Sequence, residues 1–234
     1  MNNQVRSRKL RLTTDLYKIL MTWTLWYIPI VTIGSIIASR FDWFGLEFGN
    51  FNFFFVIFRA SKAFMVLTSI IIFLYFFNHF IKNGLTRREF FWASTIAAVG
   101  VAISITIIAS VLEWLLTMLN WTEPMPELSV ISLPTWAIGL MMTLILLSSY
   151  FGGWLIAVAF YRFKLFGILF IPVGQFLLIL IEFLWEGETS LLDLMTINNP
   201  SPSLPFALSG TVVLIGLSLW IIRLLTKRVA IKPD

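Results

Sequence analysis

Long apolar runs separated by short polar segments dominate the chain. Six runs are long enough to cross a bilayer, because a hydrocarbon core of about 30 Å needs about 20 helical residues. Their expected positions are about 20–39, 63–81, 90–119, 136–160, 165–185 and 205–225. The third run exceeds one crossing, so its helix must tilt or break. The pattern predicts an all-α membrane protein, with residues 1–234 forming a single transmembrane domain of six helices.

The basic segment 1–19 precedes the first apolar run and has apolar residues at helical spacing, with charges on the other face. This pattern predicts an amphipathic helix lying in the membrane interface. The alternative is that its cations only anchor the first span on the cytoplasmic side. The residues that define the interface helix are Arg8, Arg11, Leu12, Leu16 and Lys18.

Two further segments are expected on the outer face. Residues 40–59 mix many aromatic residues with glycines and acids, a composition that favours the headgroup level, so we expect an interfacial or re-entrant segment. Residues 186–204 precede the sixth run and end in Asn-Asn-Pro-Ser-Pro, which breaks helices. Within them, Ser190–Met195 is predicted to form a short outer helical insert.

A polar elbow, residues 75–92, separates the second and third runs. Asn83 and Gly84 can end a helix, since glycine adopts the left-handed conformation without steric cost. Thr86 and Glu89 have the spacing of a capping box, which starts the next helix. The sequence therefore predicts a tight turn between two helices. Its polar residues are Lys82, Asn83, Gly84, Thr86, Arg87, Arg88 and Glu89.

Composition and charge set the class and orientation. The chain is 59% hydrophobic and only 12% charged, against about 25% charged in soluble domains. With both ends and the elbow on one side, that side carries fourteen cations and three acids, a net charge of +11. The other side carries −6, and together they give the +5 of the whole chain. The positive-inside rule then places both termini in the cytoplasm. Nucleic-acid binding is not needed to explain the positive charge.

Residues suited to catalysis are scarce. The chain has no cysteine and one histidine, His79, so we expect no metal site, and the intervening membrane separates His79 from Ser209, near the outer start of the sixth run. No P-loop motif occurs, so the chain does not bind ATP by that route. Glu113 and Glu182 lie near the outer ends of spans. They either pair with Arg59 or Lys62, or mark a substrate pathway. Gln175 lies seven residues before Glu182 and shares its helix face.

The basic amphipathic start, six spans with both ends inside, the outer insert and the elbow Asn-Gly-Leu-Thr-Arg-Arg-Glu-Phe-Phe (83–91) together resemble ABC-2-type permease subunits of bacterial ABC exporters. The pattern is most similar to the small permeases of Gram-positive peptide or antimicrobial export and immunity systems. The aromatic segment 40–59 departs from the family pattern.

The resemblance implies that the elbow residues couple to a separate ABC ATPase dimer, which binds ATP and Mg²⁺, while this chain is not an enzyme and binds no cofactor. The segment 1–19 would be the interface helix beside the elbow. A second permease copy or a paralogue would enclose a path between spans 1, 2 and 5, with Gln175, Glu182 and Glu113 as candidate path residues. An amphipathic peptide or lipid would be exported across a bacterial plasma membrane. The alternative is a stand-alone membrane sensor or immunity protein without transport activity.

Overall fold

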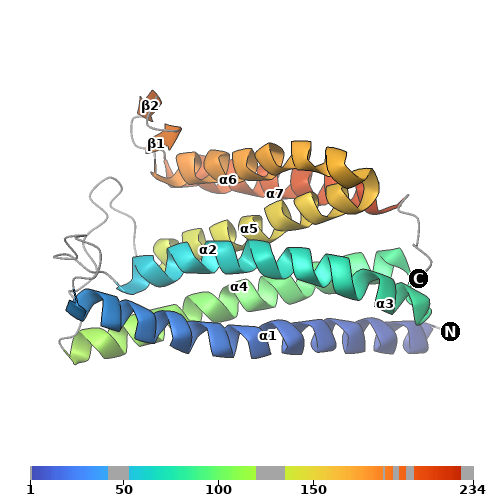
Figure 1. Ribbon diagram of the computed structural model, residues 1–234, viewed down its shortest axis with the longest axis horizontal. Helices are drawn as coiled ribbons and strands as arrows, with labels where there is room; N and C mark the ends of the chain where they lie inside the picture. Colours follow the sequence, from blue (N-terminus) through green and yellow to red (C-terminus); the bar gives the residue numbers. More distant parts are fainter. Residues whose placement is uncertain are drawn as a thin grey trace.

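The computed structural model describes residues 2–41, 53–119, 135–186, 188–191, 195–198 and 203–227. Within these ranges the elements are α1 (Asn2–Phe41), α2 (Phe53–Ile71), the π-helical turn η1 (Ile72–Phe76), α3 (Phe77–Lys82), α4 (Arg87–Met118), α5 (Thr135–Phe163), the 3₁₀ segment η2 (Lys164–Phe170), α6 (Ile171–Glu186), β1 (Glu188–Leu191), β2 (Met195–Asn198) and α7 (Leu204–Lys227). Helices α6 and α7 lie side by side along one side of the bundle, and the small β1–β2 hairpin precedes α7 (Figure 1).

In the described part of the chain, six helical segments are long and apolar enough to cross a membrane, as the sequence predicts. Their bounds are Leu10–Ile37, Val56–Lys82, Arg87–Met118, Trp136–Phe163, Phe166–Trp185 and Leu204–Lys227. This is the architecture of a multi-pass membrane protein. The start of α1 and the end of α7 lie at the same end of the bundle as α3, and the β1–β2 hairpin lies at the opposite end (Figure 1).

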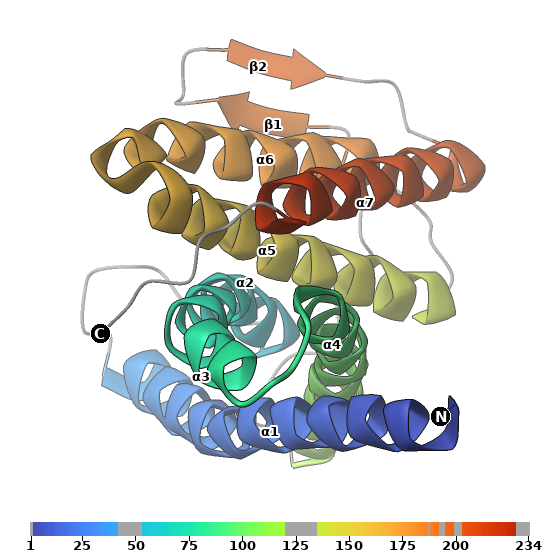
Figure 2. The same cartoon turned by 90° about the vertical axis from the view of Figure 1, so that its right-hand side faces the viewer.

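The helices form layers around α5. In Figure 2, α1 lies on one outer side, α2 and α4 come next, then α5, and α6 and α7 cover the other side. In the most apolar part of α5, 83% of the residues are buried, against 17% for α6 and for α7. A helix that is hydrophobic on all sides belongs in the centre of a membrane bundle. Hence α5 is the core onto which the two outer layers pack.

Glycines let α5 approach both neighbours closely. A Cβ added to Gly153 would meet the backbone of Val66 in α2, and one added to Gly152 would lie 3.3 Å from the carbonyl oxygen of Gly174 in α6. Small residues at such crossings let backbones pack tightly in membranes. Gly216 of α7 does not have this role, because nothing lies within 4 Å of its Cβ position.

Hydroxyl and indole groups join neighbouring helices at several depths. Such interhelical hydrogen bonds add to packing in a bilayer, where little water competes for the polar groups. The pairs are Tyr17–Ser104 at 3.0 Å (α1–α4), Tyr27–Ser61 at 3.3 Å (α1–α2), Ser94–Tyr150 at 2.8 Å and Thr143–Thr106 at 3.0 Å (both α4–α5), and Trp185–Thr211 at 2.9 Å (α6–α7).

The expected separate interface helix is wrong. Residues 2–41 form one continuous helix, α1, with no break between the basic segment and the first span. Leu12 and Leu16 are 3% and 0% exposed and belong to the core of the bundle. The apolar stripe assigned to the acyl boundary therefore faces protein, because α1 packs along α4.

Two expectations for the outer segments also need correction. In the aromatic segment, residues 42–52 lie outside the described part, but Phe53 onward is helical and belongs to α2, so residues 53–59 are not re-entrant. The predicted helix Ser190–Met195 is wrong: β1 and β2 pair antiparallel, with Glu188 opposite Asn198 and Leu191 opposite Met195. Thr189, Thr196 and Ile197 are β-branched and favour strands.

Candidate functional site: the elbow between α3 and α4

The elbow begins with a defined helix stop. Gly84 has φ +83°, the left-handed conformation that glycine was predicted to supply. The Gly84 amide donates to the Ile81 carbonyl at 3.0 Å, and the Leu85 amide donates to the Phe80 carbonyl at 3.2 Å. These bonds satisfy carbonyls that a helix end otherwise leaves without partners. The stop at the end of α3 is confirmed.

The next helix begins with the predicted capping box. The Glu89 amide donates to Thr86 Oγ1 at 3.2 Å. In return, the Thr86 amide donates to Glu89 Oε2 at 2.9 Å, and the Thr86 hydroxyl donates to the same oxygen at 2.8 Å. Reciprocal bonds of this kind fix the first turn of a helix. Only Leu85 stands between the left-handed glycine and the cap, so the turn is short and hydrogen-bonded on both sides.

Aromatic side chains support the elbow from inside the bundle. Phe77 of α3 and Phe90 of α4 are fully buried, with ring centroids 5.3 Å apart. Tyr161 of α5 lies edge-on to Phe77 at 6.1 Å, and its hydroxyl donates to Asn78 Oδ1 at 2.7 Å. Phe90 also contacts Trp154 of α5 at 6.3 Å. The two arms of the elbow are thus packed against each other and against the central helix.

The three elbow cations have different surroundings. Lys82 and Arg88 are exposed, whereas Arg87 is half-buried. The Arg87 guanidinium donates from Nη1 to the carbonyl oxygen of Lys227 at 2.8 Å. Lys227 is the last residue of α7, and a cation at a helix C-terminus is favoured by the helix dipole. Arg87 therefore ties the start of α4 to the end of α7, and Lys82 and Arg88 remain on the surface.

Arg87→Ala should loosen the end of α7 without unfolding the bundle. Loss of a charge-assisted hydrogen bond on a partly exposed helix end costs about 1 kcal/mol. Amide hydrogen exchange in residues 224–227 should therefore accelerate roughly fivefold. Arg88→Ala is the matched control, since it removes the same charge one residue away. Equal exchange in the two variants would show that the Lys227 contact contributes nothing.

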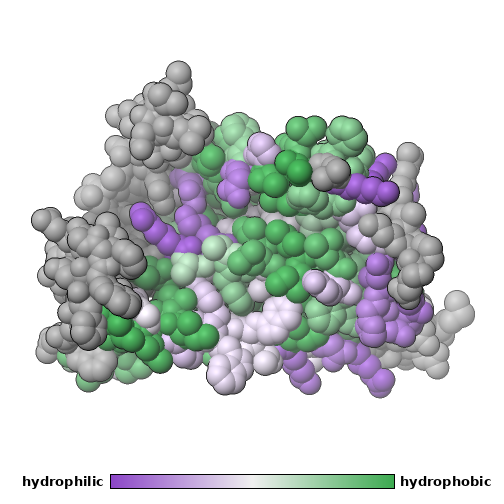
Figure 3. Space-filling model, in the orientation of Figure 1, coloured by the Kyte–Doolittle hydropathy of each residue, from purple (hydrophilic) through white to green (hydrophobic). Residues whose placement is uncertain are grey.

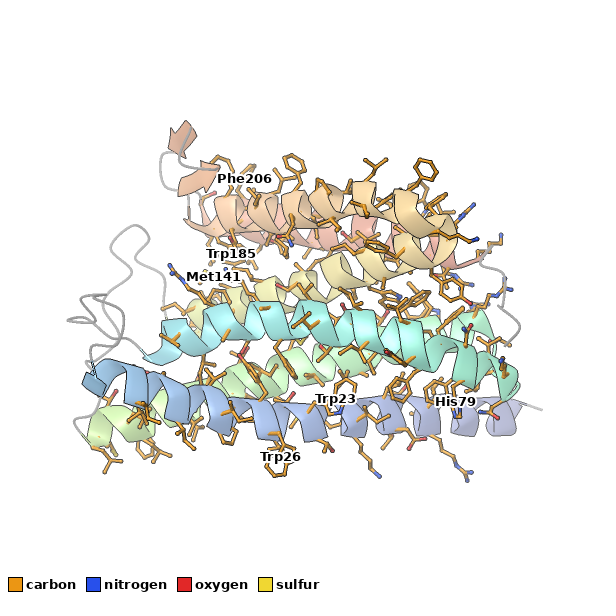
Figure 4. The ribbon with its side chains drawn as sticks, in the orientation of Figure 1. Trp23, Trp26, His79, Met141, Trp185 and Phe206 are labelled. Atoms are coloured by element: carbon orange, nitrogen blue, oxygen red, sulfur yellow. The ribbon has the colours of Figure 1, made fainter. Side chains whose placement is uncertain are left out.

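A pocket of about 330 Å³ lies between α1 and the elbow. It is lined by Arg11, Leu12, Asp15, Phe80, Asn83, Gly84 and Leu85. The structure thus brings Arg11 and Leu12 of the predicted interface segment to Asn83 and Gly84 of the elbow. Leu16 is buried in the core, Lys18 is exposed outside the pocket, and the side chain of Arg8 lies outside the described part. His79 lies at this same end of the bundle (Figure 4).

The three candidate path residues do not form one cluster. Glu182 of α6 forms an ion pair with Lys62 of α2, and both side chains are 24% exposed, so the expected pairing is confirmed for this residue. Lys62 also lies over the Phe58 ring, 5.1 Å from its centroid. Glu113 is buried in α4 and is 6% exposed, whereas Gln175 is exposed on α6.

Sequence reasoning missed the position of Arg223, which it counted only as a charge at the inner end of the last span. Its guanidinium carbon lies 5.5 Å from the centroid of the Phe91 ring, so a cation of α7 packs on the first turns of α4. The available signal was the placement of an arginine before the end of an apolar run. The position of an arginine in an apolar run predicts how deep its side chain lies in the membrane, but it does not predict which residue the side chain contacts.

Within the described ranges, no group of three or more His, Cys, Asp or Glu side chains is placed to hold a metal ion. The site is a hydrogen-bonded, packed turn with an adjoining pocket. Comparisons with protein-family models, curated proteins and solved structures give no significant match for this chain.

Proposed function

We propose that this chain is the membrane-spanning permease subunit of an ABC-2-type exporter, driven by a separate ATPase dimer that docks on the elbow. The single observation that carries the proposal is the elbow itself. It has a bonded helix stop, a complete capping box and exposed cations, Lys82 and Arg88, at the end of the bundle. A surface that receives force from a partner must hold its shape, and this turn has the contacts to do so.

The contacts of the elbow also supply a route for motion. Displacement of the turn would act directly on α3 and α4 and, through Phe77 and Tyr161, on the central helix α5. Arg87 would carry it to the end of α7. Rigid displacement of packed helices is a common way to switch between two conformations. In this mechanism ATP and Mg²⁺ bind to the partner ATPase, and the chain itself performs alternating access without chemistry on the substrate.

The transport path would lie on the face formed by α1, α2 and α6, closed by a second permease copy or a paralogue. In Figure 3 this face is largely apolar, with hydrophilic residues toward its ends. Leu67 of α2 and Phe176 of α6 are exposed and apolar, and the Lys62–Glu182 pair is an ionic contact between these two helices. An apolar wall with few charges suits an amphipathic peptide or lipid. The proposed location is a bacterial plasma membrane.

Co-purification with a nucleotide-binding partner tests the proposal. From its native host, the tagged chain in mild detergent should bring down a P-loop ATPase, and the complex should hydrolyse ATP. Reversing both exposed elbow cations, in Lys82→Glu with Arg88→Glu, should reduce recovery of the ATPase at least about tenfold, because several surface charges act together at such contacts. Arg162→Glu, an exposed cation outside the elbow at the same end of the bundle, should not.

The competing outcome is equally definite. If the chain is recovered without an ATPase and still has its effect in the cell, it is a stand-alone sensor or immunity protein. An ATPase whose recovery is unchanged by the double reversal would place the contact elsewhere on the chain.

A further inference from the structure

The pocket beside the elbow has walls and a rim of different chemistry. Leu12, Phe80 and Leu85 supply apolar walls, and Arg11 and Asp15 supply one positive and one negative charge. Its volume of about 330 Å³ falls in the lower part of the range for small-molecule sites, about 300–1,000 Å³. It is therefore large enough to take a compact, polar group.

The two charges are placed to act on one ligand. Arg11 and Asp15 lie four residues apart in α1, so they share a helix face, and both are exposed. This spacing permits an ion pair, yet within the described part of the chain neither residue forms one. Both side chains line the pocket instead. A ligand that carries both a negative and a positive group matches this arrangement.

The pocket also lies at a particular depth. The apolar run of α1 begins at about residue 20, after Arg11, Asp15 and Lys18, and the span formed by α2 and α3 ends at Lys82, directly before Asn83. The pocket therefore sits where two spans leave the apolar layer, which is the level of the lipid headgroups. The headgroup of a lipid in the adjacent leaflet can reach a pocket at this depth.

We propose that this pocket binds the zwitterionic headgroup of an aminophospholipid. The Arg11 guanidinium would bind the phosphate with two parallel N–H donors, which suits its planar geometry. The Asp15 carboxylate would accept hydrogen bonds from the primary ammonium group. A quaternary ammonium has no N–H to donate, so a choline headgroup would lack these bonds. A bound headgroup would contact Gly84 and Leu85 and so connect α1 to the elbow. None of these steps depends on the exporter proposal.

Native mass spectrometry of the full-length chain in detergent tests this site. The protein is titrated with phosphatidylethanolamine, phosphatidylglycerol and phosphatidylcholine of identical acyl chains. We expect phosphatidylethanolamine to be retained about fivefold more than either other lipid, the effect of about one partly exposed ion pair. Asp15→Asn should bring its retention down to that of phosphatidylglycerol, and Arg11→Gln should lower the retention of all three. Arg162→Gln removes a cation at the same end of the bundle and should change nothing.

A soluble competitor distinguishes a headgroup that belongs to a lipid from a free headgroup. Glycerophosphoethanolamine should displace the lipid only at far higher concentration if the acyl chains contribute, and at equal concentration if the ligand is the free headgroup; both results support the chemistry of the site. Equal retention of all three lipids, preference for phosphatidylglycerol, or insensitivity to both Arg11→Gln and Asp15→Asn would overturn the proposal. Thermal unfolding midpoints within a few degrees of the parent chain establish that both variants are folded.

Discussion

Gly153→Ala should destabilise the bundle more than any other single methyl addition at a glycine of α5. The new Cβ would lie 2.5 Å from the Val66 carbonyl oxygen and 2.9 Å from its Cα. Both atoms belong to the backbone of α2, which cannot rotate away as a side chain can. The new methyl group must therefore push α2 and α5 apart. The interface between these two helices is the most extensive one in the described part of the chain. Overpacking of this kind costs about 3 kcal/mol.

The measurement is thermal or denaturant unfolding of the purified protein in one fixed detergent. Gly216→Ala is the matched control, because nothing lies within 4 Å of its Cβ position and alanine is the better helix former. We expect that variant to keep or slightly raise the stability of the parent chain. A Gly153→Ala protein as stable as Gly216→Ala would mean that α2 and α5 do not cross as closely as described.

Breaking the Lys62–Glu182 pair should have the second largest effect. The pair joins α2 to α6, and both side chains are 24% exposed. Removing one partner of a fully buried pair costs about 3–5 kcal/mol, and partial access to water reduces this to about 1–3 kcal/mol. Lys62→Met leaves the Glu182 carboxylate without its cation, and Glu182→Gln leaves the ammonium group without its anion.

A double-mutant cycle isolates the interaction. The double variant Lys62→Met with Glu182→Gln should recover part of the loss, since neither uncompensated charge remains, and a coupling of at least about 1 kcal/mol is expected. Lys62→Arg keeps the charge and serves as the conservative control. Additive single effects, with no coupling, would show that the two side chains act separately.

The sequence was sufficient for features whose causes are local. The six spans follow from runs of apolar residues, and their positions were predicted to within about ten residues at every end. The elbow was predictable because a left-handed glycine and a capping box depend on residues at most three positions apart. Gly84, Thr86 and Glu89 adopt the expected conformations and hydrogen bonds.

Features that depend on distant residues were not predictable in the same way. Arg87 was expected to face a partner, but it binds a carbonyl 140 residues away, and no local pattern encodes that contact. The stripe of Leu12 and Leu16 has the same spacing whether it meets lipid or protein, so it was assigned to the wrong neighbour. Gly153 and Gly216 show the same limit: a small residue permits close packing, but only Gly153 has a second helix against it.

The exporter proposal requires the elbow end of the bundle to lie inside the cell. The chain has no cysteine, so single cysteines can report on each side separately. Arg88→Cys places one at the elbow, and Ser203→Cys places one at an exposed position just before α7, at the opposite end. With a membrane-impermeant maleimide on intact bacterial cells, we expect labelling of Ser203→Cys alone, and labelling of Arg88→Cys only after permeabilisation. Labelling of Arg88→Cys in intact cells, with Ser203→Cys protected, would contradict the orientation and the exporter proposal with it.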